Sequence, residues 1–208
     1  MKKTITIVIS LILLQLLRIG LRKTAFSFAE HTLLADAVYS LVFMAGITYL
    51  IILIARKKNY ELNVWPAKFS RPYVVFTIIV AAIFVLTPFI TQDTSLYNVV
   101  FLVYGALVTP VFEELIFRGY IWRELEVKGD KTAWLTTTIL FAFWHLGYID
   151  TIIWRTSMFE PDADILRIMI MKVITGAVIG AILGALRYKT KNAYSPILLH
   201  CLINTVGG

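Results

Sequence analysis

The sequence is poor in charge and has a single cysteine, Cys201. Charged residues make up only 16% of its 208 residues, whereas a soluble domain carries about 25%. One cysteine cannot form a disulfide scaffold within the chain. Intrinsic disorder is excluded as well, because 59% of the residues are hydrophobic and 13% are aromatic. With a mean hydropathy of +0.77, the chain has too few charges to cover a soluble surface, and a lipid bilayer is its expected solvent.

Seven apolar segments cover most of the chain: 4–17, 32–55, 73–90, 97–127, 132–146, 165–186 and 195–206. Several reach the about 20 residues that a helix needs to cross ~30 Å of hydrocarbon, while the first and last are shorter. Apolar residues surround each segment without a two-residue period, which favours helices over barrel strands. The sequence therefore predicts an all-α, polytopic transmembrane bundle of about seven helices (six to eight). Residues 1–208 are expected to form a single integral membrane domain.

The basic residues indicate an orientation in the membrane. If the amino terminus is cytoplasmic, fourteen of the twenty lysines and arginines fall on the cytoplasmic side and five on the outer side. This bias follows the positive-inside rule, and the acidic segment 147–164 then becomes an outer loop. The prediction is a multi-pass protein of the cell membrane with a cytoplasmic amino terminus. The net charge of +7 is assigned to orientation in the bilayer, and no nucleic-acid partner is expected.

The first apolar segment has two interpretations. Lys2 and Lys3 followed by an apolar run are typical of a cleavable signal peptide. Arg18, Arg22 and Lys23 directly follow that run, and basic residues at this place disfavour export. An uncleaved first helix is preferred, and cleavage stays open.

Six polar residues stand in segments that are otherwise apolar. Each ionisable one costs about 2.5–3.5 kcal/mol on insertion scales and is therefore a functional hypothesis. They lie in the fourth, fifth and seventh of these segments: Glu113, Glu114 and Arg118; His145; His200 and Asn204.

Helical spacing separates the roles of the two glutamates. Residues four apart share a helix face, so Glu114 and Arg118 are expected to form an ion pair with a supporting role. Glu113 lies about 100° away and has no local partner. Glu113 and His145 are each 16 residues from the turn at Gly129, so both should lie ~24 Å along antiparallel helices from the same end. Counted from the last turn, His200 and Asn204 lie at ~15 and ~21 Å and share one face.

This group favours chemistry with activated water, because no serine or cysteine stands in a nucleophile motif. Glu113 with His145 could hold and deprotonate a water molecule. His200 and Asn204 could donate hydrogen bonds to the oxyanion that forms when water attacks a carbonyl. The predicted reaction is amide hydrolysis, with Glu113, His145, His200 and Asn204 as catalytic residues.

The three motifs EExxxR at Glu113, FxxxH ending at His145 and HxxxN starting at His200 resemble the CAAX-protease and bacteriocin-processing family of intramembrane proteases. This family includes the Ras-converting endoproteases and is also called the abortive-infection family. The resemblance covers a protease core at 97–206. It implies that Glu113 and His145 activate the catalytic water and that His200 and Asn204 form the oxyanion site. A short, single-domain chain is similar to the prokaryotic members.

The sequence leaves alternatives open for the cofactor, the partners and the function. No cofactor is expected, and the alternative is zinc bound by Glu113, His145 and His200. The expected partners are the lipid bilayer and a peptide or membrane-protein substrate, cleaved near the cytoplasmic face in bacteriocin immunity or in peptide or CAAX-type processing. The rival function is a non-catalytic membrane immunity or scaffold protein, and a transporter is a weaker rival. Substrate identity and oligomeric state stay open.

Two further patterns predict packing. Gly176, Gly180 and Gly184 recur every fourth residue, so one helix face is smooth enough for a close neighbour within the chain. Four tryptophans near predicted span ends are interpreted as anchors at the membrane interface: Trp122, Trp134, Trp144 and Trp154.

Overall fold

The structure is a computed structural model and describes residues 2–207, which form helices and connecting loops without a strand. The predicted all-α polytopic bundle is confirmed. Its separate helices are α1 (Lys2–Phe28), α2 (Leu33–Lys57), α3 (Arg71–Ile90), α7 (Asp130–Trp144), α8 (Ile149–Phe159), α9 (Ile165–Thr190) and α10 (Tyr194–Gly207). Five helical stretches are long and apolar enough to cross a membrane: α1, α2, α3, 96–128 and α9.

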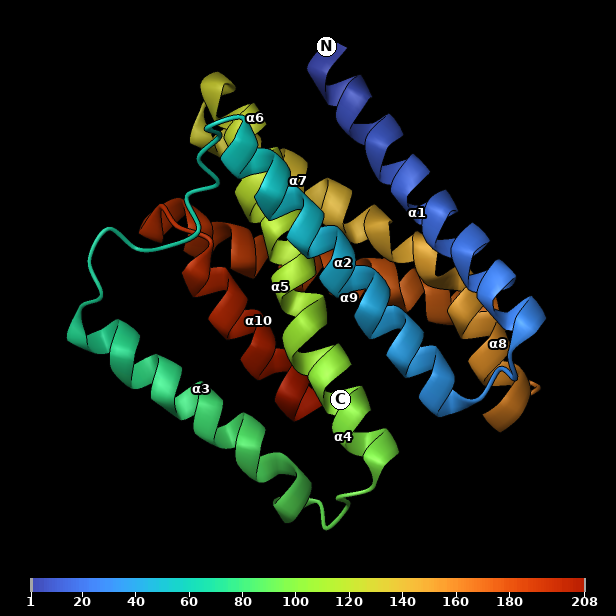
Figure 1. Ribbon diagram of the computed structural model, residues 1–208. Coiled ribbons are helices and arrows are strands. Elements are labelled where there is room, and N and C mark those ends of the chain that lie inside the picture. Colours follow the sequence, from blue (N-terminus) through green and yellow to red (C-terminus); the bar gives the residue numbers. More distant parts are fainter. Residues whose placement is uncertain (1, 208) are drawn as a thin grey trace.

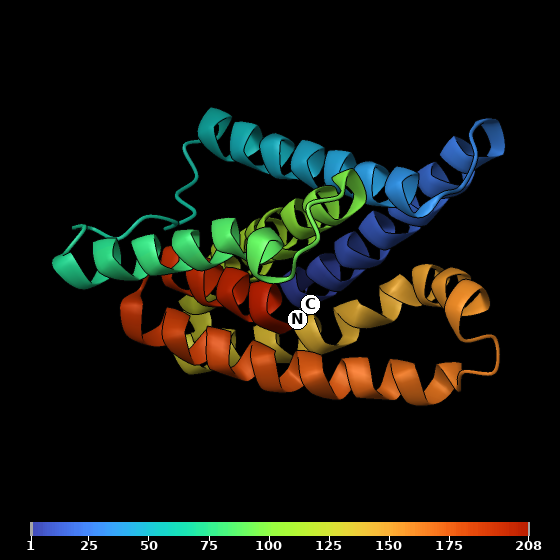
Figure 2. The same ribbon diagram turned by 90° about the horizontal axis from the view of Figure 1, so that it is seen from below.

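The stretch Leu96–Lys128 is one long helical element of changing geometry. It consists of α4 (Leu96–Leu102), a π-helical segment (Val103–Val108), α5 (Thr109–Glu114), a second π-helical segment (Leu115–Ile121), α6 (Trp122–Leu125) and a short 3-10 turn (Glu126–Lys128). It runs through the middle of the bundle, with α1 and α2 on one side and α7, α9 and α10 on the other, while α3 lies at the edge against α10 (Figures 1 and 2).

The outer surface of the bundle is largely apolar, unlike that of a soluble protein. Large apolar side chains point outward, as Leu13 on α1, Ile78 on α3 and Leu166 on α9 do. Arg118 and Glu114 are fully buried. This arrangement suits a bilayer, in which the apolar surface contacts lipid and polar groups must be satisfied inside the bundle.

The first helix is longer than predicted. The apolar run predicts a short segment at 4–17, whereas α1 continues through Arg18, Arg22 and Lys23 to Phe28. The helix continues because Arg18 pairs with Asp150, and Arg22 pairs with Asp36 and with Asp150 at 2.9 Å. These carboxylates belong to α8 and α2, so the arginines are neutralised by residues far away in the sequence.

The predicted loop at 147–164 contains a helix, which corrects the sequence-based assignment. Residues Ile149–Phe159 form α8, and only a short connection separates it from α9. Its polar residues Asp150 and Arg155 contact α1 and α2: Asp150 binds Arg18 and Arg22, and Arg155 lies 3.5 Å from Asp36.

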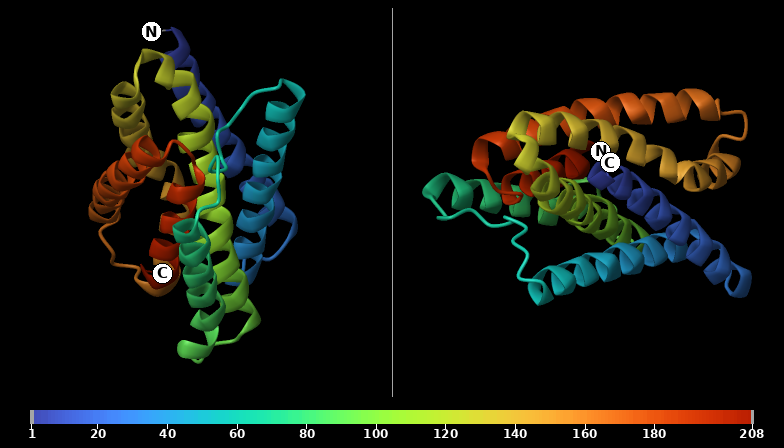
Figure 3. Two further views of the ribbon diagram at one scale, coloured as in Figure 1. Left: turned by 90° about the vertical axis from the view of Figure 1, so that its left-hand side faces the viewer. Right: turned by 90° about the horizontal axis from the view of Figure 1, so that it is seen from above.

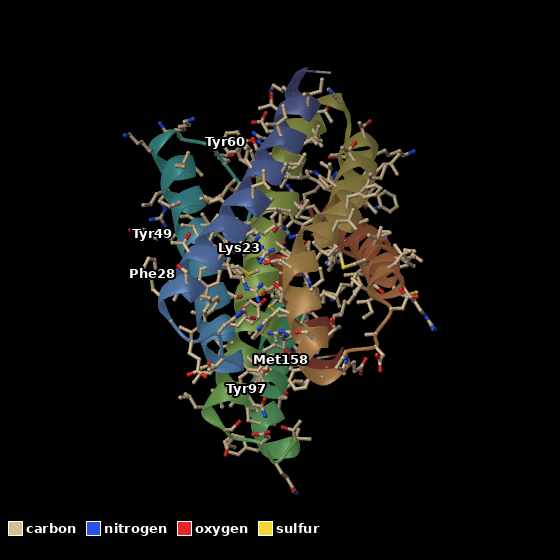
Figure 4. The ribbon with its side chains drawn as sticks, turned by 90° about the vertical axis from the view of Figure 1, so that its right-hand side faces the viewer. Lys23, Phe28, Tyr49, Tyr60, Tyr97 and Met158 are labelled. Carbon is tan, nitrogen blue, oxygen red and sulfur yellow. The ribbon has the colours of Figure 1, made fainter. Side chains whose placement is uncertain are left out.

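The bundle has two distinct ends. One carries the amino terminus and the α6–α7 connection. There Lys3 of α1 forms an ion pair with Glu124 of α6. The other carries the α3–α4 connection at 91–95 and the α8–α9 connection at 160–164 (Figure 3). In Figure 4, Tyr60 lies toward the first end, and Tyr97 and Met158 lie toward the second.

The glycine stripe of α9 packs against α7, as predicted. A Cβ atom on Gly184 would lie 2.4 Å from Cδ1 of Trp134, and one on Gly180 would lie 3.0 Å from Cδ1 of Phe141. Two tryptophans differ from their predicted interfacial place. Trp122 and Trp144 are buried in the core, because each packs on apolar side chains of neighbouring helical elements.

Candidate active site

Glu113 and Glu114 end a short α-helical turn between two π-helical segments. π-Helical turns inside a helix are frequent at functional sites, because the extra residue redirects the side chains around it. Pro110 is the second residue of the same turn and removes one backbone donor. Both carboxylates are buried, so each requires partners inside the bundle.

Glu114 forms the ion pair that its spacing predicts. Nη1 of Arg118 donates to Oε1 of Glu114 at 3.0 Å, and both side chains are fully buried. Nη2 of Arg118 donates to the carbonyl oxygen of Gly180 on α9 at 2.9 Å. The guanidinium also lies 4.5 Å from the centre of the Phe141 ring. Arg118 therefore links the central helical stretch to α7 and α9.

Glu114 has a second partner that the spacing did not predict. Nδ1 of His200 on α10 lies 3.0 Å from Oε1 of Glu114. A carboxylate accepts hydrogen bonds, so Nδ1 carries the proton. Nε2 of His200 can then donate only when the ring is an imidazolium. Glu114 thus orients His200, while His200 faces the cavity described below.

Glu113 is held by two donors from the end of α7. Oε1 of Glu113 accepts hydrogen bonds from Nε1 of Trp144 at 3.0 Å and from the hydroxyl of Tyr148 at 3.1 Å. Within residues 2–207, Oε2 has no hydrogen-bond partner. One oxygen of the carboxylate is therefore fixed by the protein, and the other is left for a further ligand.

His145 begins the 3-10 turn His145–Tyr148 that follows α7. Its Nδ1 lies 2.8 Å from the carbonyl oxygen of Phe141, which requires a proton on Nδ1 and leaves Nε2 as an acceptor when the ring is neutral. Gly176 of α9 passes close behind the ring, since a Cβ there would lie 2.8 Å from Nδ1. In the described part of the chain, Glu113 and His145 are not hydrogen-bonded to each other.

Asn204 is one turn beyond His200 on α10. Its Nδ2 donates to the carbonyl oxygen of Gly105 at 2.9 Å, which joins α10 to the first π-helical segment. An amide nitrogen carries two protons, so Asn204 retains one donor for another group.

The four predicted catalytic residues line one cavity of about 1150 Å³. Glu113, His145, His200 and Asn204 come from the central stretch, the turn after α7 and α10. Tyr148 lines the same cavity, as do three basic residues, Arg155, Arg167 and Lys172. The cavity reaches exposed residues at the end of the bundle with the 91–95 connection, among them Thr91, Asp93 and Arg167.

Zinc bound by Glu113, His145 and His200 is the alternative to a metal-free site. Among residues 2–207, no three histidine, cysteine, aspartate or glutamate residues are grouped so that they could hold a metal ion. Glu113, His145 and His200 line the cavity without forming such a group, and both imidazole Nδ1 atoms are bonded to protein oxygens.

Residues 94–206 match the family described as type II CAAX prenyl endopeptidase Rce1-like. The match covers more than half of the chain and includes all seven motif residues. The chain belongs to this family. No curated protein and no solved structure matches the chain. The Rce1-like region begins just before α4, so α1, α2 and α3 lie outside it.

The sequence patterns do not identify Trp144 and Tyr148 as hydrogen-bond donors to Glu113. Trp144 was interpreted as an interfacial anchor, and Tyr148 was placed in a loop. One signal was present, because 144 and 148 are four residues apart and flank His145. Their contact with Glu113 depends on the packing of α7 against the central stretch, which spacing alone does not give.

Proposed function

We propose that the chain is an intramembrane endopeptidase that hydrolyses a peptide bond with a water molecule activated by Glu113 and His145. The observation that carries the proposal is the convergence of these residues with His200 and Asn204 on one cavity. Membership of the Rce1-like family supports the CAAX-type class of activity. The substrate is a peptide or membrane protein, and the biological role is bacteriocin immunity or CAAX-type processing.

The geometry supports a division of labour. Oε2 of Glu113 takes a proton from water, while Nε2 of His145 accepts the other O–H and orients the oxygen. The oxygen attacks the carbonyl carbon, and the resulting oxyanion receives an N–H from Asn204 and one from the His200 imidazolium. The C–N bond then breaks, and the proton held by Glu113 passes to the leaving nitrogen. Cleavage of a defined peptide by the purified protein in lipid nanodiscs, with Glu113→Gln as reference, tests this reaction.

The side of the membrane on which cleavage takes place follows from the open end of the cavity. That end carries 91–95 and 160–164, whereas the amino terminus lies at the other end. A cytoplasmic amino terminus and cleavage near the cytoplasmic face therefore cannot both hold. We retain the orientation, because fourteen basic residues support it, and propose that the cavity opens to the outer face.

Cysteine labelling of intact cells checks this orientation. In a Cys201→Ala background, Asp93→Cys and Lys128→Cys place one thiol at each end, both at exposed positions. We expect a membrane-impermeant maleimide to label position 93 in intact cells and position 128 only after permeabilisation. The reverse pattern would place the amino terminus outside and would move cleavage to the cytoplasmic face.

A chelator experiment tests the absence of a cofactor from the proposed reaction. We expect kcat of the purified protein to be unchanged after treatment with 1,10-phenanthroline and gel filtration, because Glu113 and His145 suffice to activate water. Zinc content measured on the same sample serves as control. Loss of activity that zinc restores would instead assign Glu113, His145 and His200 as ligands.

A further inference from the structure

The carboxylate of Glu113 is held by a short segment at the end of α7. Trp144 is the last residue of that helix, and Tyr148 is the last of the 3-10 turn that follows. Their donor atoms lie 3.2 Å apart, and both bind Oε1 of Glu113. These two hydrogen bonds hold one oxygen of the carboxylate in place.

The same segment is fixed from behind by α1. Nε2 of Gln15 donates to the carbonyl oxygen of Trp144 at 3.3 Å, and Nη2 of Arg18 donates to that of Gly147 at 2.6 Å. Arg18 also pairs with Asp150, and its guanidinium lies 5.1 Å from the centre of the Tyr148 ring.

Gln15 and Arg18 act as one unit. Nε of Arg18 donates to Oε1 of Gln15 at 2.9 Å, and both residues are buried. Gly147 permits their close approach, since a Cβ there would lie 2.2 Å from Cδ of Gln15. Two buried polar side chains of α1 are thus used to hold a single turn.

We infer that Tyr148, together with Trp144, is a positioning residue for Glu113, and that Gln15 and Arg18 of α1 hold the turn that presents both donors. The inference rests on the proposed function. It extends the working site to α1, which lies outside the matched region 94–206. The two donors occupy Oε1, so Oε2 is the oxygen presented to water.

The test compares two Tyr→Phe variants of the full chain in nanodiscs. Tyr148→Phe removes one donor to Glu113. Tyr60→Phe is the matched control, because its hydroxyl donates to the carboxylate of Glu124 at 2.8 Å at the other end of the bundle. We expect Tyr148→Phe to lower kcat about 10-fold with KM unchanged, the effect of losing one charge-assisted hydrogen bond. A fall in kcat at unchanged KM separates a misplaced catalytic carboxylate from a loss of substrate binding.

The contribution of α1 is tested with Gln15→Leu. We expect a smaller loss of kcat, about threefold and again with KM unchanged, because the turn is loosened and both donors remain. In Tyr148→Phe/Gln15→Leu the loss should be smaller than the product of the two single losses, since both act through the same carboxylate. Melting temperatures of all variants identify any that fail to fold.

Three results would overturn the inference. They are a Tyr148→Phe variant with the kinetics of Tyr60→Phe, a Tyr148→Phe variant that raises KM and leaves kcat unchanged, and a double variant in which the two losses multiply fully. The wild-type protein and Glu113→Gln are measured in parallel. Cleavage by the wild type and its loss in Glu113→Gln keep the proposed function in force even if Tyr148→Phe behaves as the control. An inactive wild type refutes both.

Discussion

Replacement of Glu113 by glutamine is expected to abolish peptide cleavage while the protein still folds. Oε1 of the glutamine can still accept hydrogen bonds from Trp144 and Tyr148. The amide cannot take a proton from water, so the general-base contribution is lost. Such a contribution is worth about 10²–10⁴ in rate, and we expect kcat to fall by at least this factor. Single-turnover kinetics with a fluorogenic peptide in nanodiscs measure the loss.

The matched control for this prediction is Glu124→Gln. Glu124 lies near the last residue of the same helical stretch, at the end of the bundle that carries the amino terminus of the chain. There it pairs with Lys3 and accepts a hydrogen bond from Tyr60. We expect it to retain wild-type kcat, because it is remote from the cavity. If Glu113→Gln kept full activity or full biological effect, the catalytic assignment would fail. The polar cluster would then serve to hold helices together, as in a non-catalytic immunity or scaffold protein.

The sequence predicted the helical bundle because its evidence is local. Length, apolar composition and the missing two-residue period identify each span without knowledge of its neighbours. The pair Glu114–Arg118 could be predicted for the same reason, since residues four apart meet on any helix. That Glu113 and His145 lie on one cavity also follows from counting along two antiparallel helices from their common turn.

The features that the sequence did not predict depend on contacts between distant segments. Helix α8 looked like a polar loop because Asp150 and Arg155 are charged, and their partners Arg18 and Asp36 come from α1 and α2. The length of α1 was underestimated for the same reason. The second partner of Glu114, His200, lies 86 residues away, so spacing could suggest the ion pair but not the orientation of the imidazole.

Removal of Arg118 is expected to cause the largest loss of stability. Arg118→Met leaves the carboxylate of Glu114 buried without its guanidinium and removes one of the two side-chain donors to the carbonyl of Gly180, the other being Thr138. Breaking a buried ion pair from one side costs about 3–5 kcal/mol, which we expect as the loss in free energy of unfolding, measured by SDS titration in mixed micelles. The control is Arg123→Met, because Arg123 pairs with Glu126 and its side chain is 41% exposed. An exposed pair contributes about 0–1 kcal/mol.

A double variant separates stability from catalysis. Glu114→Leu/Arg118→Met replaces both charges by apolar groups, and such a replacement of a buried pair is often neutral or stabilising. We expect most of the lost stability to return, because no unpaired charge remains. Activity should stay low, because Nδ1 of His200 has lost the carboxylate that orients the ring. Recovery of both stability and activity would reduce Glu114 to a neutralising partner of Arg118 and would show that catalysis does not need Glu114 to orient His200.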